Sequence, residues 1–233
     1  MRSVRAAVEG SNGDRLLACA RDRQRQTPGI LRPMFDFDAH DSTLRDDAET
    51  AITRLEAWHK KVLHHWADGA CGWAPEVASK ILARSRLDRQ ASLCSCLRLW
   101  LDVPVEAQRD GHLVLAWANL GSLVEGSMKF FLSVFAHDYA NGNPIQRRGR
   151  VLDPDELGFE QLRQFFNRDV WLPPQQSWDT WLEAVQRRRN AIHAYRDREV
   201  GSHVEFLSAI VGFSEFADVL DGQVPWFDGD DAR

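Results

Sequence analysis

The sequence has little cysteine, little tyrosine and no long uncharged apolar run. Four cysteines in 233 residues are too few for a disulfide scaffold, which favours a reducing, cytoplasmic compartment. A membrane helix needs about 18 consecutive apolar residues. The longest apolar stretch, residues 113–135, is interrupted by Asn119, Glu125 and Lys129. We therefore expect a soluble protein without a membrane partner.

The signatures of several enzyme classes are also missing. The sequence contains no G-x-S-x-G elbow, no G-x-G-x-x-G turn and no phosphate-binding P-loop. Cys94 and Cys96 have no second cysteine pair to complete a zinc site. We interpret them as small buried side chains, and we expect no metal and no cofactor.

Three histidines lie close together in one predicted helix. His59, His64 and His65, with Glu56 and Asp68 nearby, lack the i, i+4 histidine pair that places two metal ligands on one helix face. We interpret this group as a solvated helix face rather than a metal site.

Charge is distributed unevenly along the chain. A formal net charge of −5 excludes nucleic-acid binding through overall charge, so any RNA contact must come from a local basic patch. Residues 1–35 carry seven arginines against three acids and lack the basic-then-apolar order of a secretion signal. We interpret residues 1–40 as a basic, partly flexible extension, residues 41–225 as one helical domain, and residues 226–233 as a disordered tail.

The apolar residues recur every three or four positions, which predicts an all-α fold. We expect helices at about 42–66, 105–139 and 177–197, capped at Ser42 and Ser177, and no sheet of three or more strands. Shorter helical segments are expected after Pro75, along the apolar run 93–101, from Asp153 to Phe166, and from Ser202 to a point before Pro225.

A basic loop follows the Asn141–Pro144 turn. Arg147, Arg148 and Arg150 could hold RNA phosphates, or they could belong to an ordinary solvated loop, and the sequence favours neither reading.

The predicted helix from Trp178 carries cations at the edge of its apolar face. Arg189 and His193, four residues apart, share one flank of that face. Arg188 and Tyr195 share the other flank, and Arg187 points to solvent. Cations beside a packing surface cost desolvation unless an anion or a partner lies nearby. The apolar face itself consists of Trp178, Trp181, Leu182, Val185 and Ile192.

Arg188, His193 and Tyr195 form an R-x4-H-x-Y pattern that resembles the motif of HEPN domains. The preceding apolar helix with its single acid, Glu125, also resembles that superfamily. The motif spans eight residues, the compatible helix order covers about 105–220, and residues 1–100 match no family. The resemblance implies an HEPN-like helical bundle with additional N-terminal helices.

The register of the motif arginine is open. Strict spacing selects Arg188, and five intervening residues would select Arg187. HEPN domains commonly have an Arg-Asn pair, which here is Arg189-Asn190. Glu125 either holds one of these arginines or lies at an exposed position.

The resemblance implies a metal-independent endoribonuclease, a toxin or defence effector. His193 would be the general acid and base, Arg188 or Arg189 the phosphate clamp, and Asn190 a supporting donor. Tyr195 would be regulatory, because the matching tyrosine is nucleotidylated in HEPN toxins paired with nucleotidyltransferases.

The partners follow from the same resemblance and from geometry. Arg188 and His193 would project about 140° apart on one ideal helix, so a two-fold homodimer is expected to assemble the site. RNA would be the substrate, and an antitoxin or nucleotidyltransferase the restraining partner. The alternatives are a catalytically inactive helical dimerisation or binding module, and a nucleotide-binding regulator that uses the arginines.

Overall fold

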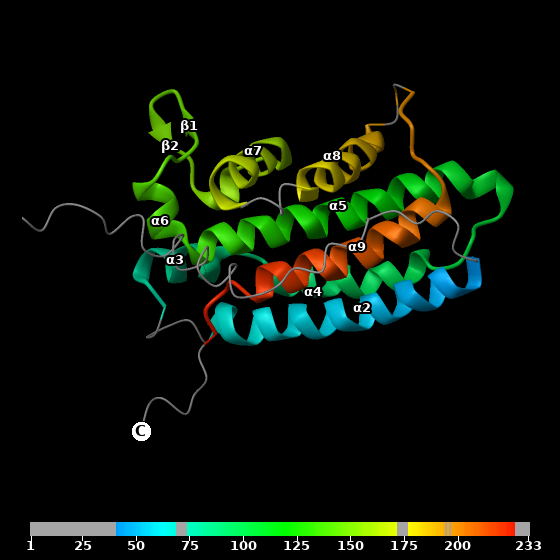
Figure 1. Ribbon diagram of the computed structural model, residues 1–233, viewed down its shortest axis with the longest axis horizontal. Coiled ribbons are helices and arrows are strands. Elements are labelled where there is room, and N and C mark those ends of the chain that lie inside the picture. The colour runs from blue at the N-terminus through cyan, green and yellow to red at the C-terminus, as the bar shows by residue number, and fades with distance from the viewer. Residues whose placement is uncertain (1–40, 69–73, 172–176, 194, 196, 227–233) are drawn as a thin grey trace, which may run out of the picture.

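The computed structural model describes residues 41–68, 74–171, 177–193, 195 and 197–226, and over these ranges the fold is all-α. The expected basic extension, residues 1–40, and most of the expected tail lie outside the described residues. Three long helices form the frame: α2 (Asp41–Leu63), α5 (Arg109–Val134) and α9 (His203–Asp221). In Figure 1, α5 runs through the middle of the molecule, between α7 and α8 on one side and α9, α4 and α2 on the other.

Shorter elements complete the described structure. The shorter helices are α3 (Glu76–Arg84), α4 (Leu87–Ser95), α6 (Ala136–Asn141), α7 (Phe159–Phe165) and α8 (Trp178–Arg189). The 3-10 turns are Cys96–Trp100, Glu106–Gln108, Pro154–Glu156 and Asn190–Ile192, and the π turns are His64–Asp68 and Phe166–Val170. Strands β1 (Gln146–Arg147) and β2 (Arg150–Val151) form an antiparallel hairpin, the one sheet in the described ranges.

A single hydrophobic core extends from Leu44 in α2 to Val224 after α9. Helix α5 is apolar on nearly all sides, and such a helix is stable only where other elements cover it completely. Trp66, Trp117 and Trp181 are fully buried around it, and each buried aromatic side chain of this size contributes about 2–3 kcal/mol. None of the described helices is long and apolar enough to cross a membrane.

The predicted helices 42–66 and 105–139 are confirmed in outline. Ser42 does not cap the first of them, because α2 begins at Asp41 and contains it, and a 3-10 turn, Glu106–Gln108, precedes α5. Phe135, with φ −99° and ψ 27°, separates α5 from α6. The predicted helix 177–197 is too long, because α8 ends at Arg189 and the 3-10 turn ends at Ile192. Ile192 is 45% exposed, so its predicted place on the buried face is wrong. The tighter 3-10 turn rotates successive side chains away from the i, i+4 stripe.

Two predicted helix starts also differ. Ser177 has helical dihedral angles and its side chain makes no capping hydrogen bond. The segment from Asp153 is not one helix: a short 3-10 turn is followed by a new helix that begins at Phe159, after Gly158. The cap that the sequence analysis missed is at Ser202, whose Oγ accepts a hydrogen bond from the Glu205 N–H at 3.2 Å.

The three clustered histidines, His59 in α2 and His64 and His65 in the π turn after it, do not form a uniformly solvated face. His59 is buried between Trp58 and Phe213, whereas His64 is exposed as predicted. Burial lowers the pKa of His59 to about 4. Over the described part of the chain, no three side chains of ligand type are grouped so that they could hold a metal ion.

The described cysteines, Cys94 and Cys96, are free, with Cys94 buried and Cys96 half-buried. Burial raises the pKa of the Cys94 thiol to about 12. A thiol that stays protonated at neutral pH is a poor nucleophile and metal ligand, which agrees with the interpretation of Cys94 as a small buried side chain.

Acidification is expected to destabilise the fold through His59. The imidazole binds a proton with a pKa of about 4 in the folded state and about 6.5 in the unfolded state. The unfolded chain therefore takes up the proton first, and the free energy of unfolding falls as the pH drops below about 6.5. One such group costs about 2 kcal/mol by pH 5.

Urea unfolding at pH 7 and pH 5 measures this loss. His59→Leu should lose about 2 kcal/mol less between the two pH values than the wild type does. The control His64→Leu alters an exposed histidine and should keep the wild-type pH dependence. If the wild type and His59→Leu lose the same free energy of unfolding between pH 7 and pH 5, the pH dependence does not come from His59.

Candidate functional site

The motif segment lies at the C-terminal end of α8, which packs against α5 (Figure 1). The side chains of Trp181 and Arg188 reach α9. The buried stripe Trp178, Trp181, Leu182 and Val185 holds α8 in place. At Gly212 of α9 an added β-carbon would lie 2.8 Å from Nε1 of Trp181. The glycine therefore lets the indole lie directly on α9, and this contact sets the position of the arginines that follow.

Arg188 points into the molecule. Its side chain is 8% exposed, and its Nη2 donates to Oε1 of Glu205 in α9. The guanidinium lies over the Trp117 ring, 5.0 Å from the ring centroid. Glu205 also accepts the Ser202 N–H at 2.7 Å through Oε2. Arg188 therefore anchors the end of α8 to the start of α9, and in one chain it has little surface for a substrate.

Gly201 makes room for this ion pair. It has a positive φ of +71°, and an added β-carbon would lie 2.6 Å from Oε2 of Glu205 and 2.8 Å from Nε of Arg188. Only glycine combines this backbone conformation with so close an approach of two side chains.

Gly201→Ala is expected to destabilise the protein more than Gly149→Ala. Both glycines have positive φ, but no atom lies within 4 Å of a β-carbon added at Gly149. The left-handed backbone alone costs about 1 kcal/mol, and overpacking against Arg188 and Glu205 adds about 1–3 kcal/mol. Thermal or urea unfolding of the two variants gives the difference directly, and equal losses would show that the crowding at Gly201 relaxes freely.

Arg189 turns the other way and lies along α5. An added β-carbon at Gly121 would be 2.4 Å from Cγ of Arg189, so the side chain rests on the bare helix backbone. Its Nη2 donates to Oε2 of Glu125 at 3.0 Å and its Nη1 to Oδ1 of Asn190 at 3.3 Å. Glu125 therefore does hold a motif arginine, and that arginine is Arg189.

Glu125 is shared between two cations. Its Oε1 lies 2.8 Å from Nζ of Lys129, one helical turn further along α5. The carboxylate is 14% exposed, whereas the Arg189 side chain is 31% exposed. Arg189 thus combines a fixed position with a solvent-facing edge, which Arg188 lacks.

His193 and Tyr195 lie beyond the end of α8 and are both exposed, Tyr195 fully so. His193 has φ −80° and ψ 46° and follows the 3-10 turn. Its imidazole makes no hydrogen bond to the residues that the structure describes. One chain therefore brings Arg189, Asn190 and Glu125 together, while Arg188 faces inward and His193 faces solvent. Arg187 is exposed, as predicted.

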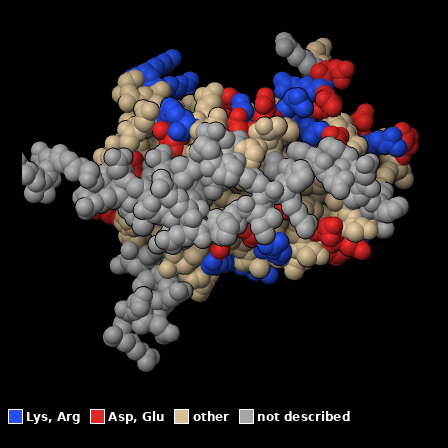
Figure 2. All heavy atoms as spheres, in the orientation of Figure 1, with Lys and Arg blue, Asp and Glu red and all other residues tan. Residues whose placement is uncertain are grey.

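The basic loop forms the β1–β2 hairpin, with positive φ at Arg148 (53°) and Gly149 (77°). Arg150 donates to both carboxylate oxygens of Glu156, at 2.8 and 2.7 Å. Arg147 and Arg148 are exposed. The hairpin and the end of α8 lie at opposite ends of the molecule, and basic side chains gather over both (Figures 1 and 2). One chain does not join them into a single basic surface.

A cavity of about 480 Å³ lies directly beside the motif segment. Ala191 and Gly201 line it together with three acids, Asp110, Asp197 and Glu199, and with one base, Arg198. This acidic lining repels phosphate. The sequence analysis missed it because Asp110 is far along the chain from the other two acids.

No protein-family model, curated protein or solved structure matches the chain. The fold and site define an all-α domain whose motif arginines are held by acids from two other helices.

Proposed function

We propose that the chain is an HEPN-type, metal-independent endoribonuclease that acts as a cytoplasmic homodimer, a toxin or defence effector restrained by an antitoxin or nucleotidyltransferase. The observation that carries the proposal is the juxtaposition at the end of α8. An exposed histidine, His193, follows within one turn of an Arg-Asn pair that Glu125 fixes against α5. A positioned guanidinium and a free imidazole are the two groups that metal-independent RNA cleavage requires.

In this proposal His193 removes the proton from the RNA 2′-hydroxyl, which attacks the adjacent phosphorus and releases the 5′-oxygen. Histidine titrates near neutral pH and can return the proton to that leaving oxygen. The guanidinium of Arg189 contacts the phosphate and stabilises the charge of the transition state. Asn190 supports Arg189, and Arg188 is a positioning residue rather than the clamp.

In this proposal a second copy of the chain completes the site with its own His193 and Arg189. Leu115 and Ile192 are exposed apolar side chains, 52% and 45% accessible. Their neighbours in the sequence, Val114 and Ala191, line the same cavity. A symmetric contact between the ends of two α8 helices would bring two His193 side chains and two Arg189 side chains to one cleft. Light scattering at micromolar concentration should give the mass of a dimer, and a monomer there would count decisively against the assembly.

The test of the activity is cleavage of RNA by the purified chain, freed of any bound partner. Cleavage should persist in EDTA, because the described residues group no metal ligands. It should weaken as salt rises, because cations hold the substrate phosphates.

A second function is favoured by a specific observation. Arg188 and Arg189 are both engaged by acids, Glu205 and Glu125, and an acid-lined cavity adjoins them. These ion pairs and the acid-lined cavity would suffice for a catalytically inactive helical dimerisation module. A stable dimer that cleaves no RNA under any tested condition would select the module.

A further inference from the structure

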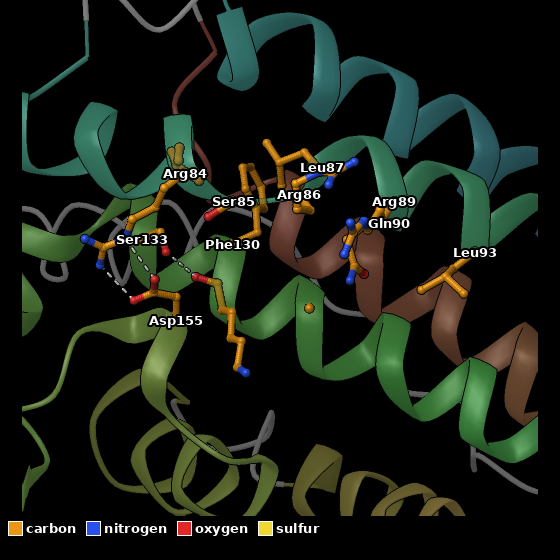
Figure 3. A pocket seen from close by; sticks show the side chains of 13 residues that line it. Arg84, Ser85, Arg86, Leu87, Arg89, Gln90, Leu93, Phe130, Ser133 and Asp155 are labelled. Carbon is orange, nitrogen blue, oxygen red and sulfur yellow. Dashed lines mark hydrogen bonds and ion pairs between the residues drawn. The ribbon is translucent and has the colours of Figure 1, made fainter.

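A second cavity, of about 320 Å³, lies between the α3–α4 corner and the C-terminal part of α5 (Figure 3). Its floor is apolar and includes Leu87 and Phe130. Its volume is at the lower end of the range of about 300–1,000 Å³ that small-molecule sites occupy. The cavity is therefore large enough for a compact ligand.

Four cationic side chains line this cavity, Arg84, Arg86, Arg89 and Lys129, against one acid, Asp155. Figure 3 shows Arg84 reaching Asp155, with Nε–Oδ2 and Nη2–Oδ1 distances of 2.9 and 3.0 Å.

The other counter-ions lie outside the lining. Arg86 pairs with Asp88 at 2.8 Å, and Lys129 pairs with Glu125 at 2.8 Å. Asp88 and Glu125 do not line the cavity, so neither carboxylate adds negative charge to its lining. Arg89 is exposed and has no ion pair with any described residue.

We propose that this cavity binds a small organic oxyanion, a phosphate monoester or a carboxylate. Arg89 takes the anionic group, because guanidinium binds both kinds of oxyanion in a two-point geometry. The apolar side chains of Leu87 and Phe130 cover the carbon skeleton. The site is independent of the proposed nuclease chemistry.

Isothermal titration calorimetry of the full chain at low salt tests the site with two probes: ribose 5-phosphate, a phosphate monoester, and citrate, a carboxylate. Binding of both supports a general oxyanion site. Binding of one alone supports the proposal and identifies the phosphate ester or the carboxylate as the preferred group. If neither probe binds at millimolar concentration, or if neutral ribose binds as well as ribose 5-phosphate, the proposal is overturned.

Arg89→Ala locates the binding. Arg89 is exposed and without an ion pair, so the variant should keep the wild-type fold while affinity falls roughly 10- to 100-fold. Arg187→Ala, which also removes an exposed arginine but lies far along the chain on α8, should bind as the wild type does. Unchanged affinity in a folded Arg89→Ala would exclude this cavity as the binding site.

Discussion

Replacing His193 with alanine is expected to abolish RNA cleavage and leave the fold intact. Loss of general acid–base help typically lowers the rate roughly 10²–10⁴-fold. The side chain is exposed and follows the last helical turn, so no core contact is lost. Single-turnover cleavage of a labelled RNA, with a circular dichroism spectrum of each variant, makes the measurement.

The matched control is His64→Ala, because His64 is also exposed but lies in the turn after α2. It should cleave at the wild-type rate. If His193→Ala retains full activity, or if both histidine variants lose activity equally, His193 has no role in the chemistry. If the wild type itself is inactive, the dimerisation module is the better account.

Arg188→Ala is expected to lower the free energy of unfolding by about 3 kcal/mol. The substitution leaves the Glu205 carboxylate without its cation and removes the guanidinium from the Trp117 ring. The loss should lie at the low end of the range for a broken buried ion pair, because the Glu205 carboxylate still accepts a hydrogen bond from the Ser202 N–H. The neighbouring variant Arg187→Ala removes an exposed side chain and should change stability by less than about 0.5 kcal/mol.

A double variant separates the two causes of that loss. The variant with Arg188→Met and Glu205→Gln keeps most of the side-chain volume and leaves no unpaired charge. It should therefore recover part of the stability that Arg188→Ala loses. The same variants address the register of the motif. If Arg188→Ala is as stable as Arg187→Ala yet inactive on RNA, Arg188 is the clamp that strict spacing selects, and our assignment to Arg189 is wrong.

The helices could be predicted from the sequence because their signals are local. Helix α2 shows apolar residues every three or four positions, and α5 is mostly apolar from Leu113 onward, so each pattern predicts a helix. The end of α8 could not be predicted in this way. The motif segment continues the helical pattern past Arg189, but the chain there forms the 3-10 turn Asn190–Ile192, which packs on α5.

The ion pairs of the site could be predicted from the sequence only in part. Glu125 and Arg189 are 64 positions apart, and nothing local in the sequence indicates which arginine an acid on another helix will meet. Glu205 could have been found, because Ser202 and Glu205 have the spacing of a capping box. That pattern places the acid at the start of α9, although it does not reveal that Arg188 shares it. The burial of His59 likewise depends on Phe213, which lies in another helix.

The close approach of Arg189 to Gly121 restricts how this protein can diverge. A β-carbon at position 121 would overlap the arginine stem, so the two positions cannot vary independently. Among descendants of this sequence, any residue other than glycine at 121 should coincide with a change at 189, because an added β-carbon would lie 2.4 and 2.5 Å from Cγ and Cβ of Arg189. Loss of the arginine would leave Lys129 as the one described cation paired with Glu125, which relaxes the requirement for an acid at 125. Covariation of these three positions would therefore mark lineages that have abandoned the arginine, whatever function they keep.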